Sequence, residues 1–435
     1  MSVSRRQIVT RLGLAAAGMA GHRVLADLEA APAAPRGVPA GEVARDERFW
    51  ARVAAQFPVS PDFVNLENGY YGIMPEPVRR AYHRAVDDLD ARGSHFLRTD
   101  YSDQADAVRD RIAALLAVTR QEIALTRGGT EALQCLIGGY RRLSPGDTVL
   151  YADLDYPAAQ YAMDWLRERR GVRVGRVVIP EPATRQAVLD VYEQALRRHD
   201  KARLLLLSHV NNRTGLATPV REIVAMARER GVDVIVDAAH SWGHLDFTLP
   251  GLGADFAVFS LHKWMGAPLG TGFVYIRQDR LADVDPAFAD RTFPADDIRS
   301  RVHSGTMDVA AVLTVPRALD FHLALGGEVK QARLRYLRRR WVGQVRDVPG
   351  LQILTPEEPA MYGAITALRV TGRTSESDNA AVARRLMDTY GLYTVARGGM
   401  AGGGGVRVTP ALFTSGDDVD RLAEALRRMV PLLRA

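Results

Sequence analysis

Short apolar runs alternate with amphipathic segments through the middle of the chain. The apolar runs have the length of buried strands and lie at 147–151, 172–179, 204–207, 233–236, 256–259 and 273–276. Segments with helical spacing lie before or between them, at 105–118, 131–142, from 157 onward, at 185–198 and at 220–230. Strands that alternate with helices predict βαβ units around a mostly parallel sheet. We therefore expect an α/β fold whose ligand lies beyond the carboxyl ends of the strands.

The pattern changes past about residue 320. Helical segments at 332–348, 379–390 and 417–429 surround strand-like runs at 365–370 and 406–409, which predicts a smaller α+β domain. We accordingly divide the folded chain into a large domain, 61–320, and a small C-terminal domain, 321–435. The glycine-rich stretch 401–405 is either a flexible loop tip or a mobile flap over the active site.

The first 60 residues have a different character. Arg5 and Arg6 precede the small, apolar stretch 12–20, and 24–26 offers small residues for cleavage. This pattern predicts a twin-arginine signal peptide over 1–26 and export of the folded protein to the periplasm; the alternative is a disordered basic tail. Residues 27–60, rich in Ala, Pro and charge, are interpreted as a linker and an N-terminal arm. The absence of another long apolar run predicts a mature protein without a membrane span.

Charge and composition narrow the class of protein. The net charge is +6, but four arginines and no acids lie within 1–26, so the remainder carries 53 − 51 = +2. The basic balance is therefore weak evidence for nucleic-acid binding once the leader is set aside. The single cysteine, Cys135, excludes an internal disulfide.

Two residues at predicted strand ends suggest a specific chemistry. Lys263 follows the apolar run 255–259, and Asp237 follows the run 232–236. A lysine amine that loses its hydration has a lowered pKa and becomes a nucleophile or base. A carboxylate at a neighbouring strand end can hold a cationic ring nitrogen. Together they are the two groups that pyridoxal phosphate (PLP) requires, although each taken alone is also typical of a solvated loop.

Further polar residues lie where a cofactor would be held. Gly128-Gly129-Thr130 follows an apolar run and opens a helix, which favours phosphate, although Thr130 is equally a simple N-cap. Asn212 and His240 follow strands and can reach a ring oxygen; Asn212 is also a typical turn residue. Ser260 and His262 flank Lys263 at distances suited to a phosphate. A metal site is the alternative for four residues, Asp237, His240, His244 and His262, but they lack compact ligand spacing and leave Lys263 unexplained.

These motifs resemble those of the class V aminotransferase family of fold-type I PLP enzymes. The resemblance covers roughly 62–430, and its most specific parts are VDAAH (236–240) and SLHKW (260–264). VNLENGYYG (64–72) and HSGTMDVAAVL (303–313) are most similar to the isopenicillin N epimerase-like branch. RVTPALFTSGDDVDRL, which begins at Arg407, is similar to the closing motif of the family. The implied fold is a large domain with a seven-stranded sheet and a smaller C-terminal α+β domain.

The resemblance implies a role for each candidate residue. Lys263 would form a Schiff base with PLP and then shuttle the proton at Cα, while Asp237 would keep the pyridinium nitrogen protonated. Tyr156 falls where the family places an aromatic residue against the ring, and many members have histidine there. The phosphate would be bound by four residues, Gly129, Thr130, Ser260 and His262, and the ring oxygen would lie near two, Asn212 and His240.

The remaining implied roles concern substrate and partner. Gly305 and Thr306 are similar to a segment that reaches the phosphate of a neighbouring subunit, which implies a homodimer with shared active sites. Arg407 matches an arginine that pairs with an amino-acid carboxylate. Tyr70 would line the substrate side, and a packing role fits it equally well.

The sequence thus predicts an exported, dimeric PLP enzyme that acts at Cα of an amino acid or of an amino-acid-bearing, peptide-like or siderophore-like metabolite. Epimerisation, transamination, C–S or β-elimination and decarboxylation all remain open. A persulfide-forming desulfurase is disfavoured, because residues 371–406 contain no cysteine and Cys135 falls in a predicted helix. The rival classes are a catalytically silent PLP-fold binding protein and a metal-dependent hydrolase.

Overall fold

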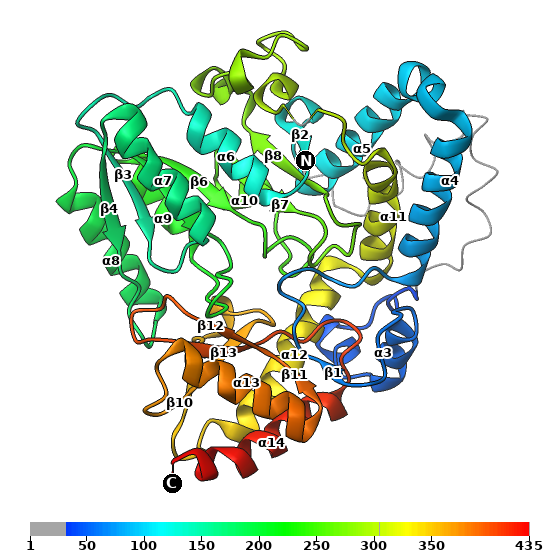
Figure 1. Cartoon of the computed structure of the whole chain (residues 1–435), viewed down its shortest axis with the longest axis vertical. Coiled ribbons are helices and arrows are strands. Elements are labelled where there is room, and N and C mark those ends of the chain that lie inside the picture. Colours follow the sequence, from blue (N-terminus) through cyan, green and yellow to red (C-terminus); the bar gives the residue numbers. More distant parts are fainter. Residues whose placement is uncertain (1–31, 304, 435) are drawn as a thin grey trace. The chain divides into compact units, whose positions relative to one another are not determined.

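The computed structural model describes residues 32–303 and 305–434. Its largest feature is a seven-stranded sheet in the order β2-β8-β7-β6-β5-β3-β4 (Figure 1). The strands are β2 (Ile123–Thr126), β3 (Thr148–Ala152), β4 (Arg173–Val177), β5 (Ala202–Ser208), β6 (Asp233–Asp237), β7 (Phe256–Ser260) and β8 (Gly272–Ile276). β4, β3, β5, β6 and β7 pair in parallel, and β8 is antiparallel to β7 and β2. The predicted mostly parallel sheet of an α/β fold is confirmed.

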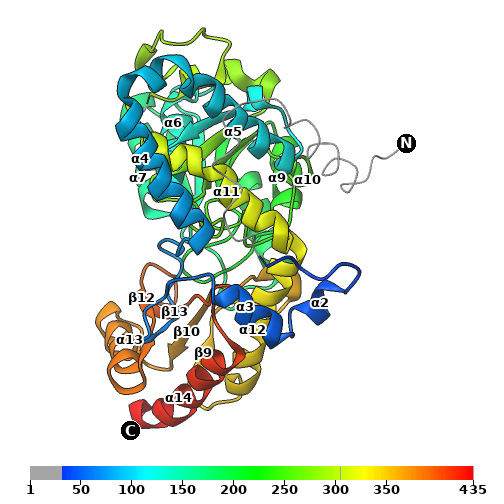
Figure 2. The same ribbon diagram turned by 90° about the vertical axis from the view of Figure 1, so that its right-hand side faces the viewer.

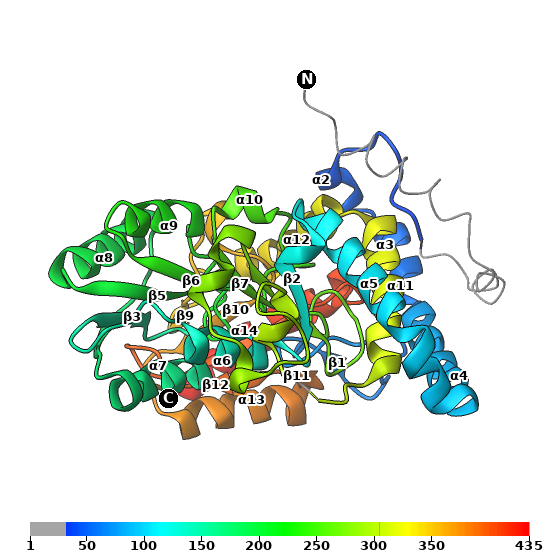
Figure 3. The same cartoon turned by 90° about the horizontal axis from the view of Figure 1, so that it is seen from above.

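Both faces of this sheet are covered, which explains why its strands are continuously apolar. In β5, Leu205 and Leu207 belong to one core, while Leu204 and Leu206 belong to the other. Helices α8 (Arg185–Arg198) and α9 (Val220–Arg228) contribute to the first core, and α6 (Gly129–Gly139) and α7 (Pro157–Arg170) to the second. Figure 3 shows these helix pairs on opposite sides of the strands. Side chains alternate across a strand, so a strand buried on both faces shows no polar alternation.

The reversed strand β8 sets the position of the predicted lysine loop. The segment between β7 and β8 spans only residues 261–271, which is too short for a helical crossover, so the chain returns antiparallel. Ser260 and Thr126 both pair with Gly272, and Asp237 pairs with Val258. The carboxyl ends of β2, β6 and β7 therefore lie at the same edge of the sheet, and residues 261–271 lie there with them.

Three long helices pack together beside the sheet: α4 (Glu76–Thr99), α5 (Tyr101–Leu116) and α11 (Val309–Leu325) (Figure 2). The sequence pattern predicts the second of these but neither α4 nor α11. Helix α11 is buried on most sides and therefore has no polar stripe to mark its period. It also contains Pro316, which normally argues against a helix interior.

The C-terminal elements form a second sheet in the antiparallel order β12-β13-β10-β9. They comprise α12 (Gly327–Val345), β9 (Leu351–Ile353), β10 (Thr366–Val370), α13 (Glu376–Tyr390), β12 (Val395–Arg397), β13 (Gly405–Val408) and α14 (Gly416–Arg434). A separate short parallel pair joins β1 (Val64–Asn65) to β11 (Leu392–Tyr393). The predicted domain boundary at residue 320 falls inside α11, and the chain from Ala31 onward forms one compact unit. The division into domains stays a prediction.

The N-terminal arm packs against the C-terminal elements through α2 (Ala40–Val43) and α3 (Glu47–Ala54). Trp50 is buried and donates its indole N–H to the carbonyl of Val43 over 2.8 Å, while Arg333 of α12 pairs with Glu47 at 2.7 Å. The predicted signal peptide, 1–26, lies outside the described residues. Within 32–303 and 305–434, no single helix has the length and apolar character of a membrane span; α11 and α12 meet that test only as a pair bent by 73°.

The remaining short helices are α10 (Leu249–Leu252), η2 (Arg120–Glu122), η3 (Gln278–Asp283), η4 (Ala287–Ala289), η5 (Ile298–Arg301) and η6 (Pro359–Met361).

Candidate active site

Lys263 and His240 meet at the carboxyl edge of the large sheet. The Lys263 Nζ atom lies 3.0 Å from Nε2 of His240, which follows β6 by three residues. Burial lowers the pKa of Lys263 to about 8, and the positive charges of Arg407 and Arg397 act in the same direction. His240 is buried, and its pKa lies well below the ordinary value for the same reason. The site therefore holds a lysine that changes between ammonium and free amine within reach of neutral pH, with a neutral imidazole beside it.

Asp237 ends β6, and of the acids that act on the pKa of Lys263 it has the largest effect. Burial raises the pKa of Asp237, and a hydrogen bond from the Ala239 amide to Oδ1, 2.9 Å long, opposes that rise. The other carboxylate oxygen, Oδ2, accepts no hydrogen bond from the described residues. A buried carboxylate that retains an unoccupied oxygen is suited to a cationic N–H group of a ligand.

The predicted phosphate-binding residues converge at the start of α6. The Gly129 amide donates to Oγ of Ser260 over 3.0 Å, so the loop after β2 meets the end of β7. A Cβ atom at Gly129 would stand 3.0 Å from that same oxygen, and at Gly128, whose φ is +155°, it would stand 3.4 Å from Cε1 of His262. His262 contacts the Thr271 carbonyl through Nδ1 at 3.2 Å. Thr130 is exposed at the first turn of α6, as a hydroxyl that receives an anion must be.

Arg407, in β13, is placed differently from its prediction. Its side chain is 1% exposed, and its Nη2 and Nε atoms bond Glu67 at 2.5 and 3.3 Å. Its Nη1 atom donates to the carbonyl of Asn212 over 2.7 Å, which brings that predicted residue to the site by its backbone. Burial lowers the pKa of Arg407 to about 10, and Glu67 opposes the shift. The arginine is therefore already paired inside the protein, with Gly69 packed against its guanidinium.

The other predicted residues lie at the surface around this edge. Tyr156 is the N-cap of α7 and is 37% exposed. Tyr70 is 75% exposed, donates its backbone amide to Glu67 over 3.0 Å, and its ring meets that of Tyr71 edge-on at a centroid distance of 6.0 Å, so its predicted substrate role and the packing alternative both stay predictions. Gly305 and Thr306 are exposed. Their predicted role toward a partner subunit stays a prediction.

Sequence reasoning missed three residues of the site. Glu67 pairs with Arg407, from which it is separated by 340 residues, and Arg397 lies 3.8 Å from the same Glu67 carboxylate. The Nε atom of Arg397 is buried and has no hydrogen-bond partner among the described residues. Trp264 donates its indole N–H to Nδ1 of His240 over 3.4 Å. Glu67 and Trp264 lie within motifs of the family resemblance and Arg397 lies in none, but only the three-dimensional contacts show the role of each.

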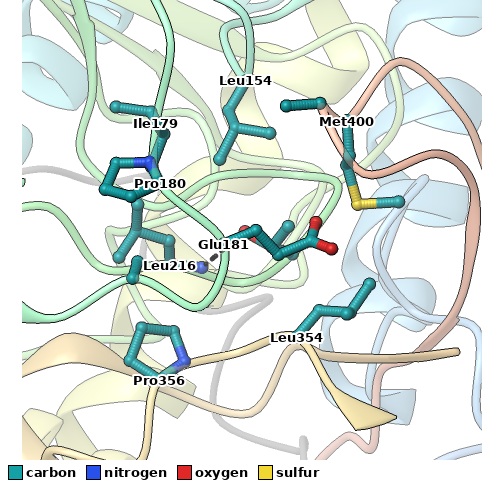
Figure 4. A pocket seen from close by; sticks show the side chains of 11 residues that line it. Leu154, Ile179, Pro180, Glu181, Leu216, Leu354, Pro356 and Met400 are labelled. Atoms are coloured by element: carbon teal, nitrogen blue, oxygen red, sulfur yellow. Dashed lines mark hydrogen bonds between the residues drawn. The ribbon is translucent and has the colours of Figure 1, made fainter.

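The glycine-rich loop, together with the residues just before it, is held by an arginine that follows β5 and by another in β10 of the smaller sheet. Arg213, after β5, donates to the Gly399 carbonyl, and Arg369 of β10 donates to the carbonyls of Gly403 and Gly404 over 2.8 and 2.6 Å. Arg369 also pairs with Glu181. Figure 4 shows Glu181 and Met400 lining the same small cavity, between the segment after β4 and this loop.

The described residues do not form the metal site that was the alternative to a PLP site. No group of three or more His, Cys, Asp or Glu side chains in the described parts of the chain could hold a metal ion. Both nitrogens of His244 are occupied, because Nδ1 contacts the His240 carbonyl at 2.9 Å and Nε2 accepts from the Ala364 amide over 2.6 Å. Cys135 lies in α6 and packs against the second core, and burial raises the pKa of its thiol to about 12. Such a thiol is not a nucleophile near neutral pH.

These groups fit PLP. A low-pKa amine, a largely buried acid with an unoccupied oxygen and a glycine cradle at a helix start are the donor set that the cofactor requires. Lys263 would carry it, Asp237 would hold the ring nitrogen, His240 would face the ring oxygen, and Gly129, Ser260 and His262 would surround the phosphate.

Comparison with known proteins agrees with this donor set. The model of the family described as aminotransferase class-V matches residues 77–422. The isopenicillin N epimerase of Streptomyces clavuligerus is 28% identical over 396 residues, covering 87% of this chain and 97% of that protein.

Solved structures show the same fold. The cysteine desulfurase CsdA of Escherichia coli aligns with a TM-score of 0.74 at 23% identity, over 88% of this chain and 98% of that chain. A mutant of C-DES, with glycine covalently linked to its PLP cofactor, aligns with a TM-score of 0.73 at 20% identity, over 86% and 98% of the two chains.

Proposed function

The chain belongs to the aminotransferase class-V family of PLP-dependent enzymes, and we propose that it is an exported member that acts at Cα of an amino acid or of an amino-acid-bearing, peptide-like or siderophore-like metabolite. The observation that carries this proposal is the contact of 3.0 Å between Lys263 and His240, beside the buried Asp237. It combines a nucleophilic amine with a partner for a ring nitrogen. When bound, PLP supplies an electron sink that weakens bonds at Cα of an attached amine.

The residues of this chain would divide the work around that cofactor. Lys263, with a pKa of about 8, changes between free amine and ammonium close to neutral pH, so it can both accept and return a proton at Cα. Asp237 would keep a positive charge on the ring nitrogen, and Gly129 with Ser260 would fix the phosphate end. Arg397 and Arg407 oppose one carboxylate, Glu67, so one positive charge remains in excess for a substrate carboxylate.

An epimerase-like or transaminase-like reaction is supported better than persulfide formation. The relative from Streptomyces clavuligerus bears the name isopenicillin N epimerase. No cysteine lies in 371–406, and Cys135 is held as a neutral thiol by its high pKa. A reaction at Cα that uses only lysine as base needs no thiol.

The test is mass spectrometry of amino acids and peptides incubated with the purified protein in deuterated water. Deuterium incorporation without other mass change indicates removal and return of the Cα proton, as in epimerisation, and a new keto acid indicates transamination. Lys263→Ala is the control: it should lose the visible absorbance band that borohydride bleaches, together with all exchange. A wild-type protein without such a band, or with exchange that survives Lys263→Ala, would contradict the proposal.

A further inference from the structure

One imidazole at the site is contacted through both of its nitrogens. His240 is buried; Nδ1 lies 3.4 Å from the indole nitrogen of Trp264, and Nε2 lies 3.0 Å from Nζ of Lys263. Trp264 is the residue directly after Lys263, but its side chain points to the opposite nitrogen of the ring. Lys263 and Trp264 thus contact opposite nitrogens of the same histidine ring.

The chemistry of the three groups determines where the histidine proton lies. An indole N–H can only donate, so Nδ1 of His240 must be the acceptor. A neutral imidazole carries one proton, which therefore lies on Nε2. That N–H points to Nζ of Lys263, which can accept it only with the lone pair of a free amine, because an ammonium group has no acceptor. While the indole bonds Nδ1, His240 can therefore form a hydrogen bond with the free amine of Lys263 but not with its ammonium form.

We propose that Trp264 is a positioning residue that holds His240 in the tautomer protonated on Nε2, so that His240 donates a hydrogen bond to the free amine of Lys263. The proposal rests on the proposed function only in taking Lys263 as the amine that carries the cofactor. A donor at Nε2 is also the polarity needed to bind an anionic ring oxygen.

Contacts from two other parts of the chain hold Trp264 in place. The ring of His244 stacks on the indole with a centroid distance of 3.9 Å and an angle of 17°. The Nζ atom of Lys330, in α12, donates to the Trp264 carbonyl over 3.2 Å and contacts Nδ1 of His322 at 3.1 Å. Because the Ala364 amide fixes His244 in turn, the indole has little freedom to leave Nδ1 of His240.

Other charged groups also act on Lys263, and a test must leave them in place. Asp237 and Glu67 favour the ammonium form, whereas Arg407 and Arg397 favour the free amine. His262 and His240 lie close enough for the lysine charge to lower their own pKa values, and both are neutral when buried. Trp264→Phe changes none of these groups, and phenylalanine keeps a ring against His244.

The experiment compares four full-length variants with the wild type: Trp264→Phe, Trp242→Phe, His240→Gln and the double variant of Trp264→Phe with His240→Gln. Each protein is stripped of cofactor, PLP is added across a pH series, and the rate at which the borohydride-bleachable band returns is measured. Without the indole donor, His240 can move its proton to Nδ1 and accept from the ammonium, which raises the pKa of Lys263. The pH at which the rate of band return is half of its maximum should therefore be higher in Trp264→Phe than in the wild type, by about one pH unit. This pH is called the midpoint below.

Two variants and one spectrum separate this effect from a packing defect. Trp242 is equally buried and packs against Phe259 and Phe273 without touching His240, so Trp242→Phe should keep the wild-type midpoint. The glutamine amide can donate or accept, so Trp264→Phe should cause no further shift in the His240→Gln background. Nitrogen-15 spectra of histidine-labelled protein, assigned with His240→Gln, should show a protonated Nε2 in the wild type and a mixture in Trp264→Phe.

The outcomes distinguish this proposal from the proposed function. A folded Trp264→Phe protein with the wild-type midpoint, or a wild-type His240 protonated on Nδ1, overturns the tautomer assignment. A wild-type protein that never acquires the band overturns the proposed function, and the nitrogen-15 spectrum then decides the tautomer alone.

Discussion

At the scale of single residues, the site depends on how burial and charge are balanced around Lys263. Burial lowers its pKa to about 8, and the carboxylate of Asp237 opposes that shift. In Asp237→Asn the opposing charge is gone, so the pKa of Lys263 should fall further, by about one unit. The pH midpoint for reattachment of PLP should then move to lower pH, since the free amine persists into more acidic solution. An unchanged or higher midpoint would show that Asp237 does not act on the amine.

The buried pair of Arg407 and Glu67 separates a structural role from a binding role. Arg407→Gln leaves the buried Glu67 carboxylate with only the more distant Arg397, at 3.8 Å, as its counter-charge, and it should lower the free energy of unfolding by up to about 3–5 kcal/mol, measured by chemical denaturation. Adding Glu67→Gln removes this weakly paired carboxylate and should restore part of that loss. In the double variant, kcat/KM for substrates with an α-carboxylate should still fall below the wild-type value, by the equivalent of about 2–4 kcal/mol, whereas kcat/KM for simple amines should fall much less. Equal losses on both substrate types would remove Arg407 from carboxylate binding.

The residues that could be predicted are those whose role is written in a local motif. Asp237, Ser260 and Lys263 lie at or after the ends of β6 and β7, which pair in parallel and so bring the three residues to the same edge of the sheet. Gly129 joins them because β2 runs in the same direction as β7, on the other side of the antiparallel β8. Glu67 could not be predicted as the partner of Arg407, because nothing in either segment records a contact across 340 residues. The local sequence around an arginine is the same whether its side chain is free to bind a substrate or is paired within the protein.

At the scale of elements, the lysine loop is fixed by a backbone contact that only glycine permits. Gly72 donates its amide to the His262 carbonyl over 2.8 Å, and a Cβ atom there would stand 2.2 Å from the Lys263 carbonyl oxygen. Gly72→Ala must therefore displace the loop, and it should cost about 1–3 kcal/mol of stability and weaken retention of PLP. Gly41→Ala in α2, where a Cβ atom meets nothing within 4 Å, is the matched control and should be neutral or slightly stabilising. Thermal unfolding and the visible band report both effects; a Gly72→Ala protein indistinguishable from Gly41→Ala would contradict the constraint.

Elements with a clear period were predictable, and those without one were not. Helix α8 occupies Arg185–Arg198 as expected, because its apolar face meets only one side of the sheet and the remainder is polar. Helix α11 lies between other elements, so burial on most sides removes the polar stripe that would have revealed it. The glycine-rich loop illustrates a third case: its composition indicates freedom, but Arg213 and Arg369 hold its carbonyls.

At the scale of the whole molecule, the export that we propose would be directed by the leader, residues 1–26. Replacing Arg5 and Arg6 together by lysine should leave the protein in the cytoplasm, because the pair is the recognition feature of the signal that we propose. Arg11→Lys, a change of the same chemistry within the same leader, should be exported normally. Immunoblots of periplasmic and cytoplasmic fractions measure both. Periplasmic protein from the double variant would contradict export by the twin-arginine route.

Assembly can be tested through the exposed Gly305-Thr306 segment, which we propose reaches the phosphate of a second copy of the chain. Thr306→Asp should repel that phosphate and, like Lys263→Ala, inactivate a dimer made of one variant alone. Mixing the two variants creates hybrids in which one site combines an intact Lys263 with the partner's intact segment. Activity should return to about a quarter of wild type, because half of randomly paired dimers are hybrids and each has one intact site of two. Hybrids that form, as shown by two different affinity tags, but stay inactive would place Thr306 at the site of its own chain.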